Sequence, residues 1–413
     1  MTPTRVGRHT DTSPRLALVV AGAAAALGSL DTAVNVAFPA LSSDMGFEVS
    51  AAQWIVVSYV LTYTCLLVGA GRIVDLVGWR TMLLWGLAIS SVSFVATAAA
   101  PNFGLLLAAR IGQGVGVAII LVAAPAMVTM SVPAKGRGRA LGLFQMSAAI
   151  GLALGPLVGG GLVAAFGWRA VFWFRFPLAI GLAVAVARWL PGAKTWPGYR
   201  QRLDLAPFRN GGFVLANVLN MLANASMFGI WLLVPYYTIE VLHTGAVMGG
   251  VVLMVVPAAS AGAAPVAGWL SDRLGAGLLV PIGLGLQSIG LLALSTTRSD
   301  SSLVYVMAAL AGVGVGLSLF GVPNMSYVMG SLSQRDQGLA AGTTQMARTA
   351  GIVLGVFITS AVFDRQRLGH ARRLGVGIDS SASFVPAFQD TFTVASAVCL
   401  ASAAVAVLIV RRH

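Results

Sequence analysis

The sequence predicts an all-α polytopic membrane protein with twelve transmembrane helices, and three observations support this fold class. Only 9% of the 413 residues are charged and 57% are hydrophobic, whereas soluble domains carry about 25% charged residues. Apolar runs of roughly 20 residues recur along the whole chain, which is the length that a helix needs to cross a bilayer core. Such continuous runs argue against a β-barrel, whose strands are short and alternate between apolar and polar residues.

The twelve apolar runs define the expected spans. The first run follows Arg5, Arg8 and Arg15, and it is longer than the apolar core of about 7–15 residues in a signal peptide. We therefore expect it to remain as the first helix. The expected spans are residues 16–40, 50–70, 80–99, 103–130, 138–164, 170–190, 211–238, 247–269, 277–296, 302–329, 338–362 and 388–410.

Basic residues between the spans predict the orientation. With a cytoplasmic N-terminus, the basic segments "PAKGRGRA" (133–140) and "ARWLPGAKTWPGYRQRLDLAPFR" (187–209) lie inside, and the acidic "LSSDMGFEVS" (41–50) lies outside. This positive-inside pattern predicts a multi-pass protein of the inner (plasma) membrane with both termini in the cytoplasm. One exception is "DRQRLGHARRLGVGID" (364–379), which is expected as a basic outside loop.

The net charge of +13 favours contact with anionic lipids of the cytoplasmic leaflet. We expect no nucleic-acid partner, because no basic stretch is interleaved with aromatic residues that could stack on bases. The two cysteines, Cys65 and Cys399, fall in apolar spans and predict no disulfide framework.

Internal repeats divide the chain into two halves. "GRIVDLVG" (71–78) recurs as "GWLSDRLG" (268–275), and "GRALGLFQMSAAIGLALG" (138–155) aligns with "GLAAGTTQMARTAGIVLG" (338–355). Repeats at an offset near 200 residues predict two six-helix halves, as in many transporter folds. The expected halves are residues 1–190 and 211–413, joined by a cytoplasmic linker at 191–210.

Five segments carry a resemblance to a known family. They are "LDTAVNVAFPAL" (30–41), "GRIVDLVGWR" (71–80), "ARIGQGVGVA" (109–118), "GLALGPLVGGG" (151–161) and "GWRAVFWFRFPLAI" (167–180). With these motifs in this order, nearly the whole chain resembles a major facilitator superfamily transporter, and in particular the drug:proton antiporters. The first and last segments are similar to the 14-span branch, although this chain has twelve spans and no room for two more in its linker.

The resemblance implies a proton-coupled secondary transporter that exports small amphipathic molecules or drugs by alternating access, and not an enzyme. Protons would be the coupling ion, with no other cofactor, and the protein would be a monomer with a small-molecule substrate. An importer or facilitator of a polar metabolite on the same fold is the alternative. A membrane sensor or enzyme is more remote, because the sequence has no metal-ligand cluster, phosphate loop, nucleophile–base set or soluble domain.

Asp31 is the expected proton-coupling residue, with Arg110 as its partner. An ionisable side chain deep in a span usually faces a cavity and has a function there. Counting along the helices places Asp31 about 14 Å and Arg110 about 10 Å from the same surface, close enough to pair. Two alternatives stay open: Asp31 could be a structural carboxylate that is permanently paired, and Arg110 could extend to the outer headgroups.

Amide side chains on one helix face predict a central cavity. Asn217, Asn220 and Asn224 follow an i, i+3, i+7 spacing, so they either line the cavity or bond neighbouring helices. Arg348 could bind an anionic group or pair with a carboxylate, although the spans of the second half offer no obvious acidic partner. The further cavity candidates are Asn35, Gln53, Trp54, Gln113, Gln145, Tyr236, Asn324 and Gln345.

Two motifs predict conformational control. In the family, the loop containing Gly71, Arg72, Asp75, Gly78 and Arg80 holds the halves together in the outward-open state through charge contacts and a helix dipole; Asp272 occupies the matching place in the second half. A solvated turn is the alternative. Gly151, Gly155 and Pro156 would either bend their helix or allow tight helix packing, and the resemblance associates this motif with export.

Overall fold

The computed structural model describes residues 14–46, 53–190, 206–244, 246–375, 377 and 380–410. Within these ranges, twelve helices are long and apolar enough to cross a membrane. This confirms the prediction of an all-α polytopic membrane protein with twelve spans. A helix is favoured because the bilayer core holds no water for the backbone N–H and C=O groups of the chain. In a helix these groups form hydrogen bonds within the segment.

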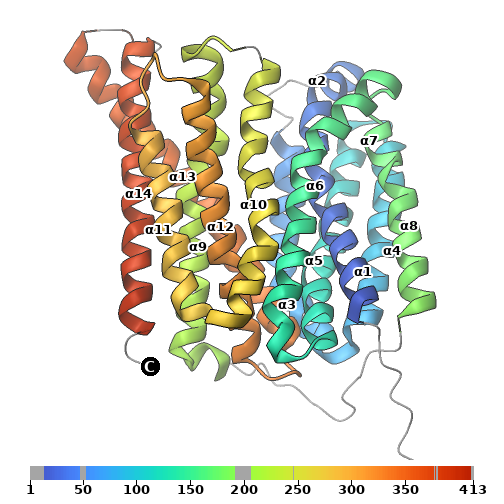
Figure 1. The fold of residues 1–413 in the computed structure, drawn as a ribbon. Helices are drawn as coiled ribbons and strands as arrows, with labels where there is room; N and C mark the ends of the chain where they lie inside the picture. Colours follow the sequence, from blue (N-terminus) through green and yellow to red (C-terminus); the bar gives the residue numbers. More distant parts are fainter. Residues whose placement is uncertain are drawn as a thin grey trace, which may run out of the picture.

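The first six spans lie together on one side of the molecule, and the last six lie on the other (Figure 1). The first group comprises α1 (Pro14–Ser29), η1 (Leu30–Thr32), α2 (Ala33–Met45), α3 (Gln53–Val77), α4 (Trp79–Ala98), α5 (Phe103–Ser131), η3 (Ala134–Gly136), α6 (Arg137–Phe166), α7 (Ala170–Trp173) and α8 (Arg175–Trp189). The second comprises η4 (Ala206–Arg209), α9 (Gly211–Tyr236), η5 (Tyr237–Val241), α10 (Ala246–Leu274), α11 (Ala276–Ser295), α12 (Leu303–Ser331), α13 (Gln337–Leu374) and α14 (Ser381–Val410).

Helices from the two groups meet mainly where α6 packs on α10 and α3 packs on α13. These are the segments of the internal repeats, so the two contacts are related by the repeat. Helix α8 ends at Trp189 and α9 begins at Gly211, on either side of the predicted linker. Most of that linker, residues 191–205, lies outside the described residues.

Both the start of α1 and the end of α14 lie at one face of the molecule, at the bottom of Figure 1. We call this the terminal face. The ends of α3 and α10 and the starts of α6 and α13 also lie there, because successive spans alternate in direction.

Asn102, Asn210 and Ser302 cap helix starts by accepting a hydrogen bond from a backbone N–H of the first turn, which satisfies donors that lack a partner within the helix.

The prediction of a basic loop at 364–379 is wrong for most of that segment. Helix α13 continues to Leu374 and ends at Gly375, whose φ of 64° is left-handed. Arginine, glutamine, leucine and alanine are strong helix formers, and a left-handed glycine is a common helix end. The extension contacts α14 through His370, whose Nε2 lies 2.8 Å from Asp390 Oδ2, while Arg365, Arg372 and Arg373 are exposed.

Candidate functional site

A cavity of about 340 Å³ lies between the two helix groups and is lined by both. The first group contributes side chains of α1, η1, α2 and α6, and the second contributes α9, α10, α12 and α13. Aromatic and aliphatic side chains are interspersed with hydroxyls and amides. The polar lining residues are Ser29, Thr32, Asn35, Gln145, Asn220, Asn224, Ser260, Ser318, Asn324, Thr344, Gln345 and Arg348.

Most of the predicted cavity residues line this cavity, and four do not. Those that line it are Asn35, Gln145, Asn220, Asn224, Asn324, Gln345 and Arg348. Trp54 and Tyr236 are 53% and 56% exposed but lie elsewhere on the surface. Asn217 bonds its own helix through Phe213 O at 2.9 Å, and Gln113 lies in the ion cluster described below. The side chain of Gln53 lies outside the described residues.

Two of the cavity amides, Asn220 and Asn324, also join helices, so both interpretations of the asparagine stripe hold at Asn220, whereas Asn224 bonds within its own helix. Asn220 Nδ2 donates to Thr344 O of α13 at 2.8 Å, and Asn224 Nδ2 donates to Asn220 O at 2.8 Å. On α12, Asn324 Nδ2 donates to Ala216 O at 3.1 Å. These bonds fix the amide groups, so the cavity wall is preorganised.

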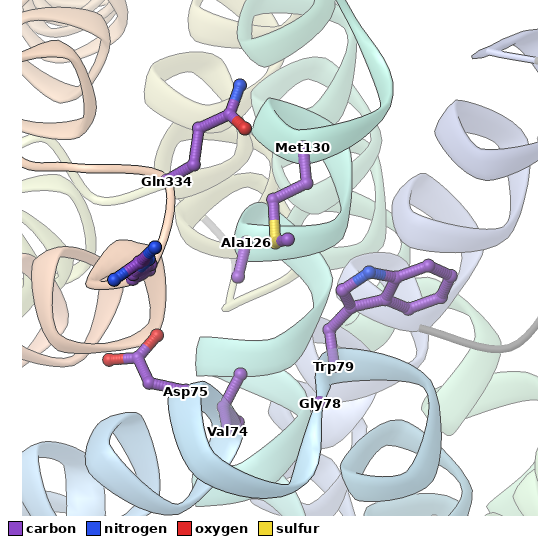
Figure 2. Close-up of a pocket in the computed structure, with 8 residues that line it drawn as sticks. Val74, Asp75, Gly78, Trp79, Ala126, Met130 and Gln334 are labelled. Atoms are coloured by element: carbon purple, nitrogen blue, oxygen red, sulfur yellow. The ribbon is translucent and has the colours of Figure 1, made fainter. Parts of the chain in front are cut away.

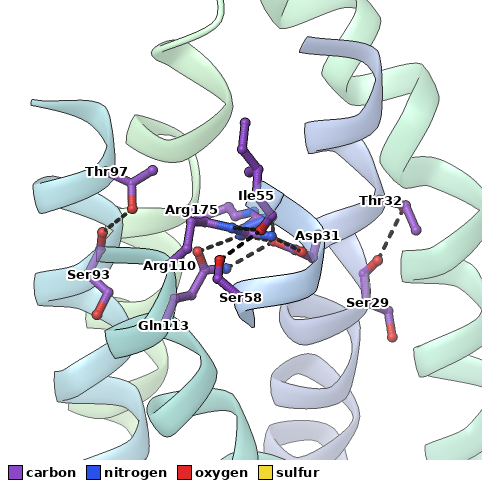
Figure 3. Close-up of polar contacts among 10 residues, drawn as sticks. All are labelled: Ser29, Asp31, Thr32, Ile55, Ser58, Ser93, Thr97, Arg110, Gln113 and Arg175. Atoms are coloured by element: carbon purple, nitrogen blue, oxygen red, sulfur yellow. Dashed lines mark hydrogen bonds and ion pairs between the residues drawn. The ribbon is translucent and has the colours of Figure 1, made fainter. Parts of the chain in front are cut away.

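Asp31 lies beside the cavity, in an ion cluster with Arg110, Arg175 and Gln113 (Figure 3). Arg110 donates to both carboxylate oxygens of Asp31 at 2.8 Å, and Arg175 donates to Oδ1 at 2.8 and 2.6 Å. Gln113 Nε2 donates to the same oxygen at 3.0 Å. The predicted Asp31–Arg110 contact is therefore present, and Arg110 does not extend to the headgroups.

The cluster is well shielded from water. Arg110 and Arg175 are 0% and 1% exposed, and Asp31 is 15% exposed. Arg110 also donates to Ile55 O at 3.1 Å and to Gln113 Oε1 at 2.7 Å, and it lies over the Tyr59 ring. Two guanidinium groups thus face one carboxylate, which leaves one positive charge without a negative partner inside the cluster.

Arg175 was not predicted from sequence, although its segment was recognised. It follows the aromatic run "AVFWF", and its guanidinium lies over the rings of Phe94 and Phe172. A basic residue surrounded by aromatic residues near a span start is a signal for a buried arginine. Gln113 carried a clearer signal, because its i+3 spacing places it on the same helix face as Arg110.

The short turn η1 explains why Asp31 faces the cluster while its neighbours face the cavity. Ser29, Thr32 and Asn35 line the cavity, and Asp31 points to the opposite side of the same turn (Figure 3). Thr32 Oγ1 donates to Leu152 O at 3.3 Å. Close packing of α6 against this turn requires glycine, because a Cβ at Gly155 would collide with Thr32 and one at Gly151 would collide with Ala26.

These contacts favour packing over bending as the role of Gly151 and Gly155. Pro156 lies inside the continuous helix α6, which runs unbroken from Arg137 to Phe166. Proline is tolerated in transmembrane helices because neighbouring groups satisfy the freed carbonyl.

Two carboxylates join the helix groups at the terminal face. Asp75 accepts hydrogen bonds from the backbone N–H groups of Gly338 and Leu339 at 2.6 and 2.9 Å. Asp272 accepts equivalent bonds from Gly138 and Arg139 at 2.7 and 2.9 Å. Each carboxylate thus lies at the N-terminus of a helix of the other group, where the helix dipole favours negative charge.

The terminal face is tightly packed around these carboxylates. Arg72 Nη1 lies 3.2 Å from Asp336 Oδ1, and a Cβ at Gly71 would lie only 2.5 Å from Gly338 O. The pocket beside Asp75 (Figure 2) has a volume of about 10 Å³, which is room for no more than one water molecule. These contacts close the described part of the terminal face around Asp75.

Two residues of the first motif act within their own helix group. Arg80 Nη2 donates to Ala187 O of α8 at 2.8 Å, so it makes no bond to the second group among the described contacts, contrary to the predicted gate. Gly78 has a φ of 94°, a conformation that favours glycine, and it forms the tight turn between α3 and α4.

Comparison with known proteins identifies the family. The family model of the Major Facilitator Superfamily matches residues 18–356. The chain belongs to this superfamily. It is 23% identical over 94% of its length to the riboflavin transporter RibZ of Clostridioides difficile (strain 630), of which it covers 95%. It is 28% identical over 80% of its length to the multidrug resistance protein Stp of Mycobacterium tuberculosis (strain CDC 1551 / Oshkosh), of which it covers 72%.

A solved superfamily structure has the same fold. The human organic anion transporter MFSD10 (TETRAN) superimposes with a TM-score of 0.77 at 16% identity, over 95% of this chain and 99% of that one. At this identity the likeness concerns the fold alone. Family, relatives and fold together show that the chain is a multi-pass membrane transporter and not an enzyme.

Proposed function

We propose that this superfamily member exports small amphipathic molecules by alternating access and is driven by the proton gradient. The observation that carries the proposal is the central cavity, which combines amides and hydroxyls with aromatic side chains and lies between the two helix groups. A site of this composition suits molecules with both polar and apolar surface. The similarity to a multidrug resistance protein also favours drug export.

The direction of access follows from the contacts at the terminal face. There Asp75 and Asp272 join the two helix groups, and we assign this face to the cytoplasm because the basic segments adjoin it. On this assignment the described conformation faces outward. Export would require these contacts to break, so that the cavity opens to the cytoplasm, and to form again before release. The plasma membrane, with anionic lipid at the cytoplasmic leaflet, is the proposed location, and a monomer is the proposed unit.

Asp31 is the proposed coupling residue. In the described conformation its carboxylate accepts hydrogen bonds from three side chains, an arrangement that suits the ionised form. Protonation would therefore accompany a conformation in which η1 has moved away from α5 and α8. Because Ser29 and Thr32 of the same turn line the cavity, substrate in the cavity could move Asp31.

Proton flux in liposomes tests this proposal. Wild type and Asp31→Asn are reconstituted with a lumenal pH dye, and amphipathic antibiotics of negative, zero and positive charge are added against a proton gradient. We expect substrate-dependent proton flux in wild type and none in Asp31→Asn. Asp44→Asn makes the same chemical change at a half-exposed carboxylate and should retain the flux.

The other outcomes contradict defined parts of the proposal. Equal flux in wild type and Asp31→Asn excludes Asp31 as the coupling residue. Substrate movement without proton flux excludes proton coupling. The double variant Asp31→Asn/Arg175→Gln also lacks the carboxylate but restores the charge balance, so it separates loss of coupling from loss of fold.

The second candidate is uptake or facilitation of a polar metabolite, which the similarity to a riboflavin transporter supports. Intact cells distinguish the two candidates. Expression should lower the cellular content of a substrate if the chain exports it, whereas an importer or facilitator should raise it or equalise it across the membrane.

A further inference from the structure

Arg348 differs from the other two deep arginines of the protein. Arg110 bonds Asp31, Ile55 O and Gln113 Oε1, and Arg175 bonds Oδ1 of Asp31 through both of its Nη atoms. Arg348 lies at the cavity wall and is exposed to it. It makes no ion pair or hydrogen bond with any residue in the described part of the chain.

The surroundings of Arg348 contain no compensating negative charge. No aspartate or glutamate is among the described residues that line the cavity. A cation held deep in a membrane protein is costly unless an anion or water compensates it, so the site is suited to a ligand that brings its own negative charge.

The local charge balance points in the same direction. The cavity and the adjacent ion cluster together hold three arginines, Arg110, Arg175 and Arg348, against the single carboxylate of Asp31. Asp75 and Asp272 are distant from this region and are occupied by backbone N–H groups at the terminal face. This excess of positive charge attracts anions into the cavity and repels cations.

The rest of the cavity wall suits an aromatic or aliphatic body. Phe228 and Trp231 of α9 and Phe320 of α12 line it, and Gln345 lies one turn before Arg348. A planar guanidinium can bind a carboxylate through two parallel hydrogen bonds, while the aromatic side chains take up apolar surface.

We propose that Arg348 binds the carboxylate of the transported molecule, so that the cavity selects amphipathic monoanions over neutral and cationic molecules of the same shape. That the bound molecule is also transported rests on the proposed function, whereas binding of an anion by Arg348 can be tested without transport.

Binding of ligands that share an aromatic body and differ in the charge of the head group provides the test. Purified protein in nanodiscs of neutral phosphatidylcholine is titrated with 1-naphthylacetate, 1-naphthaleneacetamide and 1-naphthylmethylammonium, and with cinnamate and cinnamamide. Isothermal calorimetry at neutral pH measures each affinity. We expect wild type to bind each carboxylate about tenfold or more tightly than its amide, as for a hydrogen-bonded charge pair, and to bind the ammonium most weakly.

Variants assign the effect to the site. Arg348→Gln should abolish the preference for carboxylate over amide, and Arg348→Lys should retain part of it. Arg188→Gln, which removes the same charge from an exposed position at the end of α8, should keep the wild-type preference. Near-ultraviolet circular dichroism or the thermal unfolding midpoint of each variant checks that it is folded.

Three results would overturn the inference. They are equal or tighter binding of the amides or the ammonium by wild type, a carboxylate preference that persists in Arg348→Gln, and no carboxylate binding up to millimolar concentration. The proposed function fails separately. Export of neutral molecules that is unaffected by Arg348→Gln would refute the inference alone, whereas Arg348-dependent anion binding without export from cells would refute export alone.

Discussion

Asp31 is surrounded by more positive charge than it can neutralise, and this imbalance has a consequence for stability. Replacing Asp31 by asparagine leaves the guanidinium groups of Arg110 and Arg175 buried without a carboxylate. Breaking a buried ion pair by removing one partner costs about 3–5 kcal/mol. We therefore expect Asp31→Asn to lower the thermal unfolding midpoint in detergent strongly.

The double variant makes this expectation specific to charge. Asp31→Asn/Arg175→Gln removes one of the two unpaired cations, so it should be more stable than Asp31→Asn alone. The single variant Arg175→Gln should be only mildly affected, because Arg110 still bonds both oxygens of Asp31. A double variant less stable than Asp31→Asn would show that packing, and not charge balance, dominates the cluster.

Asp44, beyond the first span, provides a pH-dependent contact at the face opposite the terminal face. Hydrogen bonds from Trp168 and then from Arg169, at 2.9 and 2.8 Å, hold the pKa of Asp44 below its ordinary value of 3.8. A lowered pKa stabilises the fold above the pKa of the unfolded chain, and the stabilisation is lost as the pH falls through the folded pKa.

The measurement is the difference in unfolding midpoint between wild type and Asp44→Asn. It should be constant from pH 7 to about pH 5 and should shrink below about pH 4, where the carboxyl begins to be protonated in the unfolded chain, until it is protonated in the folded chain too. A difference that stays the same down to pH 3 would contradict this assignment.

At the residue scale, sequence predicted the ion pair but not its full composition. Depth along two helices was enough to pair Asp31 with Arg110, because distance along a helix axis follows from residue counting. Rotation about the axis does not follow so easily in a membrane, where most faces are apolar. For this reason Tyr236 and Asn217 were placed in the cavity but lie elsewhere, and the contribution of Arg175 from a distant span was missed.

At the scale of helices, the contact between α3 and α13 depends on glycine at its centre. A Cβ at Gly71 would lie 2.5 Å from Gly338 O, which is closer than side-chain carbons approach backbone. Gly71→Ala should therefore separate the two helices at the terminal face and increase the population of the conformation open there. Double electron–electron resonance between spin labels at the terminal-face ends of α3 and α13 would detect longer distances.

Gly69→Ala is the matched control in the same helix. A Cβ at Gly69 would meet nothing within 4 Å, so the variant changes helix propensity equally without touching α13. Its distance distribution should match wild type. If Gly69→Ala and Gly71→Ala shift the distances equally, the effect arises from helix propensity and not from the close approach.

The ends of helices were predictable where the sequence has strong end signals. The end of α13 was not predicted correctly. Hydropathy falls after its apolar stretch, so sequence reading ended the helix with the membrane. Helix propensity has no such limit: the polar residues after Asp364 are helix formers, and the helix stops only at the left-handed Gly375. The extension is stabilised further by Arg367, which lies over the rings of Phe363 and Phe384.

At the scale of the whole molecule, the internal repeat becomes an approximate symmetry of contacts. Asp75 caps α13, and Asp272, its counterpart in the repeat, caps α6. The offset of the repeats in sequence predicted two related halves, but it could not predict that each half would supply the carboxylate that binds the other. That relation depends on packing of the halves, which no local pattern encodes.

This symmetry makes a quantitative prediction about the closed terminal face. Each carboxylate accepts two backbone hydrogen bonds that exist only while that face is closed. An asparagine has one acceptor oxygen and would turn its amide donors toward the second N–H. A hydrogen bond to a charged group contributes about 1.5–3 kcal/mol, so Asp75→Asn and Asp272→Asn should each shift the equilibrium toward the open terminal face by about tenfold or more.

The two shifts should combine additively in free energy, because the carboxylates share no contact partner and both stabilise the same closed conformation. The double variant should then shift the ratio of open to closed molecules by about the product of the two single shifts. The populations follow from electron resonance distances between labels on the terminal-face ends of α6 and α10 and of α3 and α13. A double variant no more open than either single variant would mean that one contact alone controls closure, and that the two halves do not contribute equally to it.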